Sequence, residues 1–213
     1  PKGWRIELVD KPDRQQVQVM WGQAAVPASH ADHLPLTIAL TAFGGGAMKA
    51  TLMDEVRSKR GLAYGAYMGL GSQRGPAAVR GWASTGTERA VTTLKLVLRL
   101  FRQLGKGGLT EERFRFFQGY LAAGYGPATD DPGARLLARV RADINGLPTD
   151  WVDTYPERVR AVTLDDVNRA IRTHLTPDHL AITLVGTASE LVPLLEKAKI
   201  DRGAIDVVPY DSY

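Results

Sequence analysis

The chain opens with two segments in which hydrophobic and polar residues alternate, within residues 4–22. A period of two predicts β-strands with one buried face. A turn at residues 11–13 separates the segments, and the apolar positions are Trp4, Ile6, Leu8, Val17, Val19 and Trp21. We therefore expect two strands that each turn one side to a hydrophobic core.

Helical spacing follows. Apolar residues recur every three or four positions from Leu36 to Phe43 and again from Met48 to Arg60, and a glycine ends each run. These runs predict two helices. Residues 63–72 and 77–85, which carry glycines, aromatic residues and β-formers around a Gly-Pro turn, predict a hairpin.

Most of the chain beyond Thr87 has helical spacing. We predict helices that begin near Thr87, Thr110, Pro132, Trp151 and Thr163, where capping residues or a tolerated proline occur. Residues 180–185 are apolar on both faces and predict a central strand; a last helix at 189–199 and a short tail follow.

This order of elements predicts an α+β fold. We expect a single α/β roll in which residues 4–22, 63–85 and 180–185 form one mixed, mostly antiparallel sheet. Helices between Leu34 and Leu175 would cover one face of that sheet. No linker or repeat interrupts the pattern, so residues 1–213 are predicted to form one domain.

Composition excludes several kinds of chemistry. The chain has no cysteine, which removes disulfides, thiolate metal sites and cysteine nucleophiles. Its net charge is +4, and no run of basic residues supports nucleic-acid binding. A basic helix face is either a solvated surface or an attractor of acidic peptide or phosphate; it consists of Lys95, Arg99, Arg102 and Lys106. No apolar run is long enough to span a bilayer, and the first residue, Pro1, suggests a piece of a longer chain or a processed product.

Common catalytic motifs are also missing. The glycines at 44–46 lack the spacing of a phosphate-binding loop, and no H-x-x-E-H or H-E-x-x-H occurs. His30 and His33 have only Asp32 beside them in the sequence, and His174 and His179 straddle a turn. Because a catalytic zinc needs three converging protein ligands, we predict no metal site in this chain.

Arg57 and Tyr64 are the most informative pair. Arg57 lies one turn before the predicted helix end, Gly61 reverses the chain, and Tyr64 opens the next strand. The two side chains can converge, and both donate hydrogen bonds that suit a peptide carbonyl or the oxyanion formed from it. From the residues alone, a structural role remains open, because arginine near a helix C-terminus and an aromatic residue at a strand start are both common.

This segment resembles the pitrilysin-type (inverzincin) zinc metallopeptidases. Their signature L-x-x-x-[LIV]-R-x-K-x-G-L-[AG]-Y is matched at Leu52, Val56, Arg57, Lys59, Gly61, Leu62, Ala63 and Tyr64, downstream of a glycine-rich turn. Further similar segments begin at Leu109, Ala161 and His179, so the resemblance covers about residues 16–187.

The resemblance implies that the chain is the zinc-free half of a clamshell peptidase. In this family one domain carries H-x-x-E-H and zinc, and the other supplies an Arg/Tyr pair, here Arg57 and Tyr64, that binds substrate. Gly44, Gly45 and Gly46 stand where processing-peptidase relatives have a substrate-contacting loop. The implied partners are a zinc-bearing domain or subunit and a peptide, and the chain alone would be inactive.

Two points leave the role open. After the glycines, many relatives have Ser-Ser-Arg-Leu, whereas this chain has Lys49-Ala50-Thr51-Leu52, so any role of that arginine is missing. Some members of the family are structural subunits, and a non-catalytic assembly role is the alternative function. We expect a bacterial protein of either the periplasm or the cytoplasm.

Overall fold

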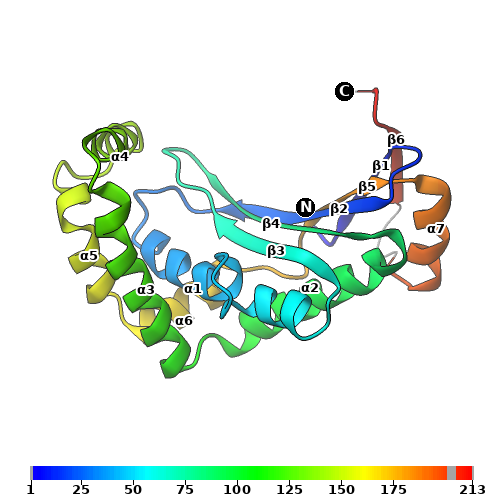
Figure 1. Ribbon diagram of the computed structural model, residues 1–213. Coiled ribbons are helices and arrows are strands. Elements are labelled where there is room, and N and C mark those ends of the chain that lie inside the picture. Colours follow the sequence, from blue (N-terminus) through cyan, green and yellow to red (C-terminus); the bar gives the residue numbers. More distant parts are fainter. Residues whose placement is uncertain (1, 201–204, 213) are drawn as a thin grey trace.

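Six strands form one sheet in the computed structural model, which describes residues 2–200 and 205–212 (Figure 1). Their order across the sheet is β3-β4-β2-β5-β1-β6. The strands are β1 (Arg5–Asp10), β2 (Gln16–Ala25), β3 (Ala63–Leu70), β4 (Ala77–Gly86), β5 (Ala181–Gly186) and β6 (Ile205–Pro209).

The pairing is mixed. β3, β4, β2 and β5 are successively antiparallel, whereas β1 is parallel to both β5 and β6. The predicted α+β class with a mostly antiparallel sheet is therefore confirmed. The sequence analysis assigned no strand to the short tail after the last helix, whereas Ile205–Pro209 extends the sheet beside β1. Five residues without a clear alternation carry too little signal to identify such an edge strand.

The helices lie mainly on one side of the sheet (Figure 1). They are α1 (His33–Gly44), the π-helix η1 (Met53–Ser58), α2 (Thr87–Gly107), α3 (Glu111–Thr129), α4 (Pro132–Ile144), α5 (Trp151–Ala161), α6 (Leu164–His174) and α7 (Ala188–Lys197). α1, η1 and α2 pack directly on the strands, α3 and α6 pack on α1, and α4 and α5 lie farther out. The predicted cover over one face is thus built in layers.

The alternation seen in the sequence sets which face is buried. In β2, Val17, Val19 and Trp21 are almost completely buried, while Gln16 and Met20 on the opposite face are exposed. The inward side chains of the sheet join those of the helices in one hydrophobic cluster. No helix of the described residues covers the middle of the opposite face, which is flanked by α4 at one end and β6 at the other (Figure 1).

Helix ends follow the capping signals in part. Thr110 caps α3 by accepting a hydrogen bond from the Arg113 backbone, and Thr163 and Asp166 form the expected capping box of α6. Thr87 is the first residue of α2 and not its cap, which is Gly86.

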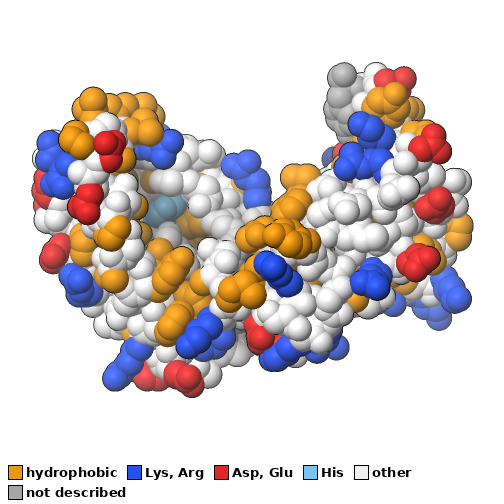
Figure 2. All heavy atoms as spheres, in the orientation of Figure 1, with side chains coloured by type: hydrophobic (Ala, Val, Ile, Leu, Met, Phe, Trp, Pro, Cys, Tyr) orange, Lys and Arg blue, Asp and Glu red, His pale blue; other side chains and the backbone are white. Residues whose placement is uncertain are grey.

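The outer helix α4 leaves apolar side chains on the surface. In Figure 2 they form a patch at the end of the molecule where α4 lies. Its members are Leu136, Leu137, Val140 and Ile144. Among the described residues no helix has the length and apolar character that crossing a membrane would require.

Candidate functional site

The helix that carries Arg57 is wider than the sequence predicts. A single α-helix was expected over residues 48–60, but Met53–Ser58 forms a π-helix, in which the Lys59 N–H donates to the carbonyl of Asp54, five residues earlier. The hydrophobic spacing of so short a run does not distinguish the two helix types. π-Helical turns are rare and frequently occur at functional sites.

The strand that carries Tyr64 is also irregular. Gly61 adopts a positive φ of 56° and reverses the chain, and the Arg89 guanidinium donates to its carbonyl at 2.9 Å. In the following strand Ala63 pairs with Thr85 and Gly65 pairs with Ser84, so Tyr64 is the extra residue of a β-bulge. A bulge re-aims the side chain of its extra residue. Tyr64 is 81% exposed as a result.

These two irregularities bring Arg57 and Tyr64 side by side. The Arg57 guanidinium carbon lies 4.6 Å from the centroid of the Tyr64 ring. Such a cation–π contact at an exposed position contributes about 0.5–1 kcal/mol. Neither the guanidinium nor the Tyr64 hydroxyl has a protein hydrogen-bond partner among residues 2–200 and 205–212.

Neighbouring acids do not neutralise Arg57. Lys59 pairs with Asp54 and with Glu55, both at 2.7 Å, and Arg60 pairs with Glu55 at 2.6 Å. Hydrogen bonds from Lys59 and Arg60 hold the pKa of Glu55 below its usual range. A structural role for Arg57 would have paired it with one of these two carboxylates. These carboxylates instead pair with Lys59 and Arg60.

The three glycines of the predicted loop have different surroundings. Gly44 is buried at the end of α1, where a Cβ would clash with the backbone of Met68 in β3. Gly45 and Gly46 are exposed, and Gly46 has a positive φ of 87°. Gly44 therefore has a clear packing role, and so has Gly45, where a Cβ would lie 2.7 Å from Cα of Thr41. Their exposure still leaves Gly45 and Gly46 accessible for the predicted substrate contact.

Tyr67, a residue that the sequence analysis did not single out, connects these segments. A Cβ on Gly46 would lie 3.6 Å from Cε1 of Tyr67, and one on Gly65 would lie 2.7 Å from its Cε2. The Tyr67 ring thus lies between the glycine turn and the backbone beside Tyr64. The sequence did not predict this placement of Tyr67, because the strand is irregular and its hydrophobic pattern has no clear period.

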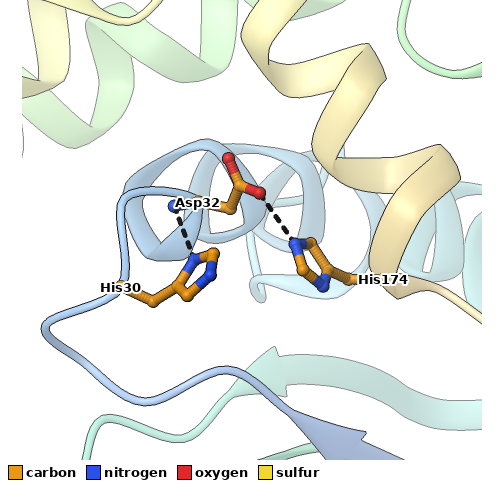
Figure 3. A group of neighbouring side chains, drawn as sticks. All are labelled: His30, Asp32 and His174. Carbon is orange, nitrogen blue, oxygen red and sulfur yellow. Dashed lines mark hydrogen bonds and ion pairs between the residues drawn. The ribbon is translucent and has the colours of Figure 1, made fainter.

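A second polar cluster lies at the start of α1 (Figure 3). Nε2 of His174 lies 2.7 Å from Oδ2 of Asp32, and the Asp32 backbone N–H donates to Nδ1 of His30 at 3.0 Å. Arg169 pairs with the other oxygen of Asp32 at 2.8 Å. The sequence places Asp32 beside His30 but does not predict the contact of His174 with Asp32, because 142 residues separate the two.

This cluster has the donor types of a metal site, since one ligand atom each from His30, Asp32 and His174 lies within 4.8 Å of the others. The hydrogen bonding opposes that use. Nδ1 of His30 accepts a hydrogen bond from the Asp32 backbone N–H, which places the proton of the neutral ring on Nε2, the nitrogen left for a metal. Arg169 also brings a positive charge to Asp32. The arrangement suits a structural contact in which Arg169 and His174 of α6 hold Asp32 at the start of α1, and we call it the Asp32 clamp.

The comparison with protein families points to peptidases. Residues 1–116 of the 213 match the family model described as the Peptidase M16 inactive domain. The match includes Arg57, Tyr64 and the three glycines.

Individual relatives agree with this match. An uncharacterized zinc protease of Mycobacterium tuberculosis, Rv2782c, is 25% identical over 85% of the chain, which spans 41% of that protein. The crystal structure of a peptidase M16 inactive domain from Pseudomonas fluorescens superposes with a TM-score of 0.78 and 26% identity, covering 87% of this chain and 43% of that one. A Helicobacter pylori relative, the non-peptidase homolog YmxG, is 21% identical over 66% of this chain and 33% of its own. The chain thus spans about two fifths of the length of the mycobacterial relative.

Proposed function

Because the chain belongs to the family of M16 peptidase inactive domains, we propose that it holds peptide substrate for a zinc endopeptidase whose zinc lies in another domain or subunit. In this proposal the two halves close on an extended peptide, and the chain alone is inactive. Rv2782c is named a zinc protease, and the chain spans only part of it, which leaves room for a zinc-bearing half.

One observation carries the proposal: Arg57 and Tyr64 are adjacent, and their side-chain donors have no hydrogen-bond partner in the part of the chain that the structure describes. The acids nearest in sequence are occupied by Lys59 and Arg60. A buried tyrosine and an arginine paired with Asp54 or Glu55 would have indicated a purely structural signature. The observed arrangement has neither feature, which supports a role in binding an acceptor from outside the chain.

A peptide carbonyl fits these two donors. The guanidinium carries several N–H groups and a permanent charge, so it can hold the carbonyl oxygen before and during the reaction. The Tyr64 hydroxyl is a neutral donor whose hydrogen bond strengthens as the oxygen becomes negative in the tetrahedral transition state. The zinc of the other half would supply the activated water that attacks the carbonyl carbon.

A non-catalytic assembly subunit is the second candidate. It is favoured by the relative YmxG, whose name describes a non-peptidase homolog. In that case the exposed Arg57–Tyr64 pair would bind no substrate, and substitutions there would alter neither peptide binding nor cleavage.

The experiment that separates the two uses the natural full-length protein, or this chain together with its zinc-bearing half. We expect chelator-sensitive cleavage of a quenched peptide library by the assembly and no cleavage by this chain alone. Peptide cleavage that survives removal of this chain would contradict the proposal. Absence of cleavage by the zinc-loaded assembly would leave the assembly subunit as the better description.

A further inference from the structure

Three side chains form a row on the uncovered face of the sheet, beside the Arg57–Tyr64 pair. Tyr67 of β3 lies opposite Trp82 of β4, and Trp82 lies opposite Met20 of β2. Residues directly opposite one another on neighbouring strands share a face of the sheet. The Tyr67 and Trp82 rings stack at 5.7 Å with an angle of 16°. We call Tyr67, Trp82 and Met20 the aromatic platform.

The platform is held in place by hydrogen bonds. The Trp82 indole N–H donates to Oε1 of Gln18 at 2.6 Å, and the Gln18 amide donates to the Ser84 hydroxyl at 3.0 Å. Ser84 in turn donates to Oε1 of Gln16 at 3.1 Å. These bonds satisfy the polar edge of the indole within the sheet, so the surface left to a ligand is apolar. An indole fixed in this way loses little side-chain freedom on binding.

The platform is open to solvent. Tyr67, in the edge strand β3, is 38% exposed. Met20 is 44% exposed, although its strand, β2, lies in the interior of the sheet. Figure 2 shows hydrophobic side chains gathered on this side of the molecule near the middle of the sheet. Isolated exposed apolar residues are ordinary, but a contiguous, fixed aromatic surface is typical of a binding site.

Its position links the platform to the proposed reaction site. The Tyr67 ring lies over Gly65, the residue that follows Tyr64 in the bulge. An extended peptide advances by about 3.3 Å per residue, with side chains on alternating sides. A peptide whose carbonyl is held by Arg57 and Tyr64 can therefore place a side chain on the platform about two or three residues away.

We propose that the aromatic platform binds a large apolar side chain, preferentially an aromatic one, of the peptide held by Arg57 and Tyr64. This inference rests on the proposed function. Stacked rings offer a wide face on which a further ring packs in an offset or edge-on geometry. Arg80, in the adjacent row, pairs across the strands with Gly22 and Gly69, and its charge disfavours basic side chains there.

The test measures cleavage selectivity in the natural full-length protein. Quenched peptides that differ only by Phe or Ala are compared at each position within three residues of the cleaved bond. We expect kcat/KM for Phe to exceed that for Ala by about 10-fold or more at one position, from burial of the ring. Tyr67→Ala should reduce this ratio to about 1–3, and Tyr67→Phe should retain it. Tyr120→Ala, at an exposed tyrosine of α3, is the matched control.

A binding measurement separates this inference from the proposed function. After zinc is removed with a chelator, the dissociation constants of the Phe and Ala peptides are measured for the same variants. A Phe preference that Tyr67→Ala abolishes supports the platform even if the loaded protein cleaves nothing. Cleavage or binding with the same Phe-to-Ala ratio in the unsubstituted protein and in Tyr67→Ala overturns the platform and leaves the Arg57–Tyr64 proposal intact. Loss of contact between the two halves in Tyr67→Ala, without a change in the ratio, would show that the other half covers this surface and would also overturn it.

Discussion

The guanidinium carbon of Arg57 lies 4.6 Å from the centre of the Tyr64 ring, although each residue belongs to an element that departs from regular geometry. Arg57 lies in a π-helix and Tyr64 is the extra residue of a β-bulge. Regular geometry in either element would aim these side chains differently. Two independent irregularities thus place side by side two donors that have no hydrogen-bond partner among the described residues, as the proposed substrate role requires.

Removal of the Tyr64 hydroxyl tests its role as an oxyanion donor. In the assembled protein, Tyr64→Phe should lower kcat by about 10²–10³ and change KM little, because the lost hydrogen bond is made mainly in the transition state. The ring stays, so the contact with Arg57 is kept. Steady-state kinetics with one quenched peptide measure both constants. Tyr120→Phe, at another exposed tyrosine, should have no effect; equal rates in the two variants would rule out the donor role.

Replacement of Arg57 should have a different kinetic signature. Arg57→Ala removes a charged donor from the ground state and the transition state alike, so we expect KM to rise as well as kcat to fall. Arg57→Lys should recover only part of the loss, because a lysine lacks the planar fork of an arginine. The matched control is Arg172→Ala on α6, which removes one exposed positive charge elsewhere. Kinetics that match the control would leave only a structural role for Arg57.

Much of the fold could be predicted from the sequence, because strong local patterns produce it. The alternation of Val17, Val19 and Trp21 indicated the buried face of β2, and the capping box at Thr163 gave the start of α6. The layered placement of α3, α4 and α5 could not be predicted in the same way. An amphipathic helix shows that one face is buried, but not whether a strand or another helix covers it.

The site was predictable only in part, for a related reason. Arg57 and Tyr64 are close in the sequence, so a turn at Gly61 sufficed to bring them together. Tyr67 acquires its importance from neighbours in other segments, namely Gly46 and Trp82. The contact of His174 with Asp32 likewise depends on how α6 packs on α1. Single-sequence patterns carry no information about such long-range contacts.

Zinc retention by the isolated chain is expected to be weak. The His30–Asp32–His174 cluster offers three donors, but the proton arrangement at His30 and the charge of Arg169 oppose a cation. We expect less than about 0.1 zinc per chain after dialysis against buffer with micromolar free zinc, measured by metal analysis. His174→Ala should leave that value unchanged. One zinc per chain that disappears in His174→Ala would instead establish this cluster as a metal site.

Gly44→Ala should destabilise the protein although alanine favours helices. A Cβ at position 44 would clash with the Met68 backbone, which cannot move without displacing β3. Overpacking of this kind costs about 1–3 kcal/mol in the free energy of unfolding. Gly119→Ala in α3 is the matched control, since nothing lies within 4 Å of its Cβ position. That variant should gain about 0.5–1 kcal/mol from helix propensity. Denaturant unfolding measures the free energy of unfolding of both variants. Equal values for Gly44→Ala and Gly119→Ala would contradict the packing role of Gly44.

The Asp32 clamp predicts a pH dependence of stability. Hydrogen bonds from Arg169 and from His174 hold the pKa of the buried Asp32 carboxyl below its ordinary value of 3.8. A carboxyl whose pKa is lower in the folded state stabilises the fold while it is ionised, and this contribution is lost as pH falls through the folded pKa. Asp32→Asn should therefore cost about 1–3 kcal/mol near neutral pH, where it removes the charge that Arg169 and His174 contact.

The difference in unfolding free energy between the unsubstituted protein and Asp32→Asn shows whether folding lowers or raises the pKa of Asp32. The other carboxyl groups are common to both proteins, so their contributions largely cancel in this difference. It should be constant above about pH 5 and shrink as pH falls below 3.8, because Asp32 then takes up a proton in the unfolded state before it does so in the folded state. Below the folded pKa the carboxyl is protonated in both states and the difference stops changing. Asp165→Asn, an exposed position in the first turn of the same helix as Arg169, should show a difference below about 0.5 kcal/mol throughout. A gap between the protein and Asp32→Asn that widens on acidification would mean that the folded state raises, and does not lower, the pKa of Asp32. In that case the clamp would be held by a protonated carboxyl, and Arg169 would not be the partner that stabilises it.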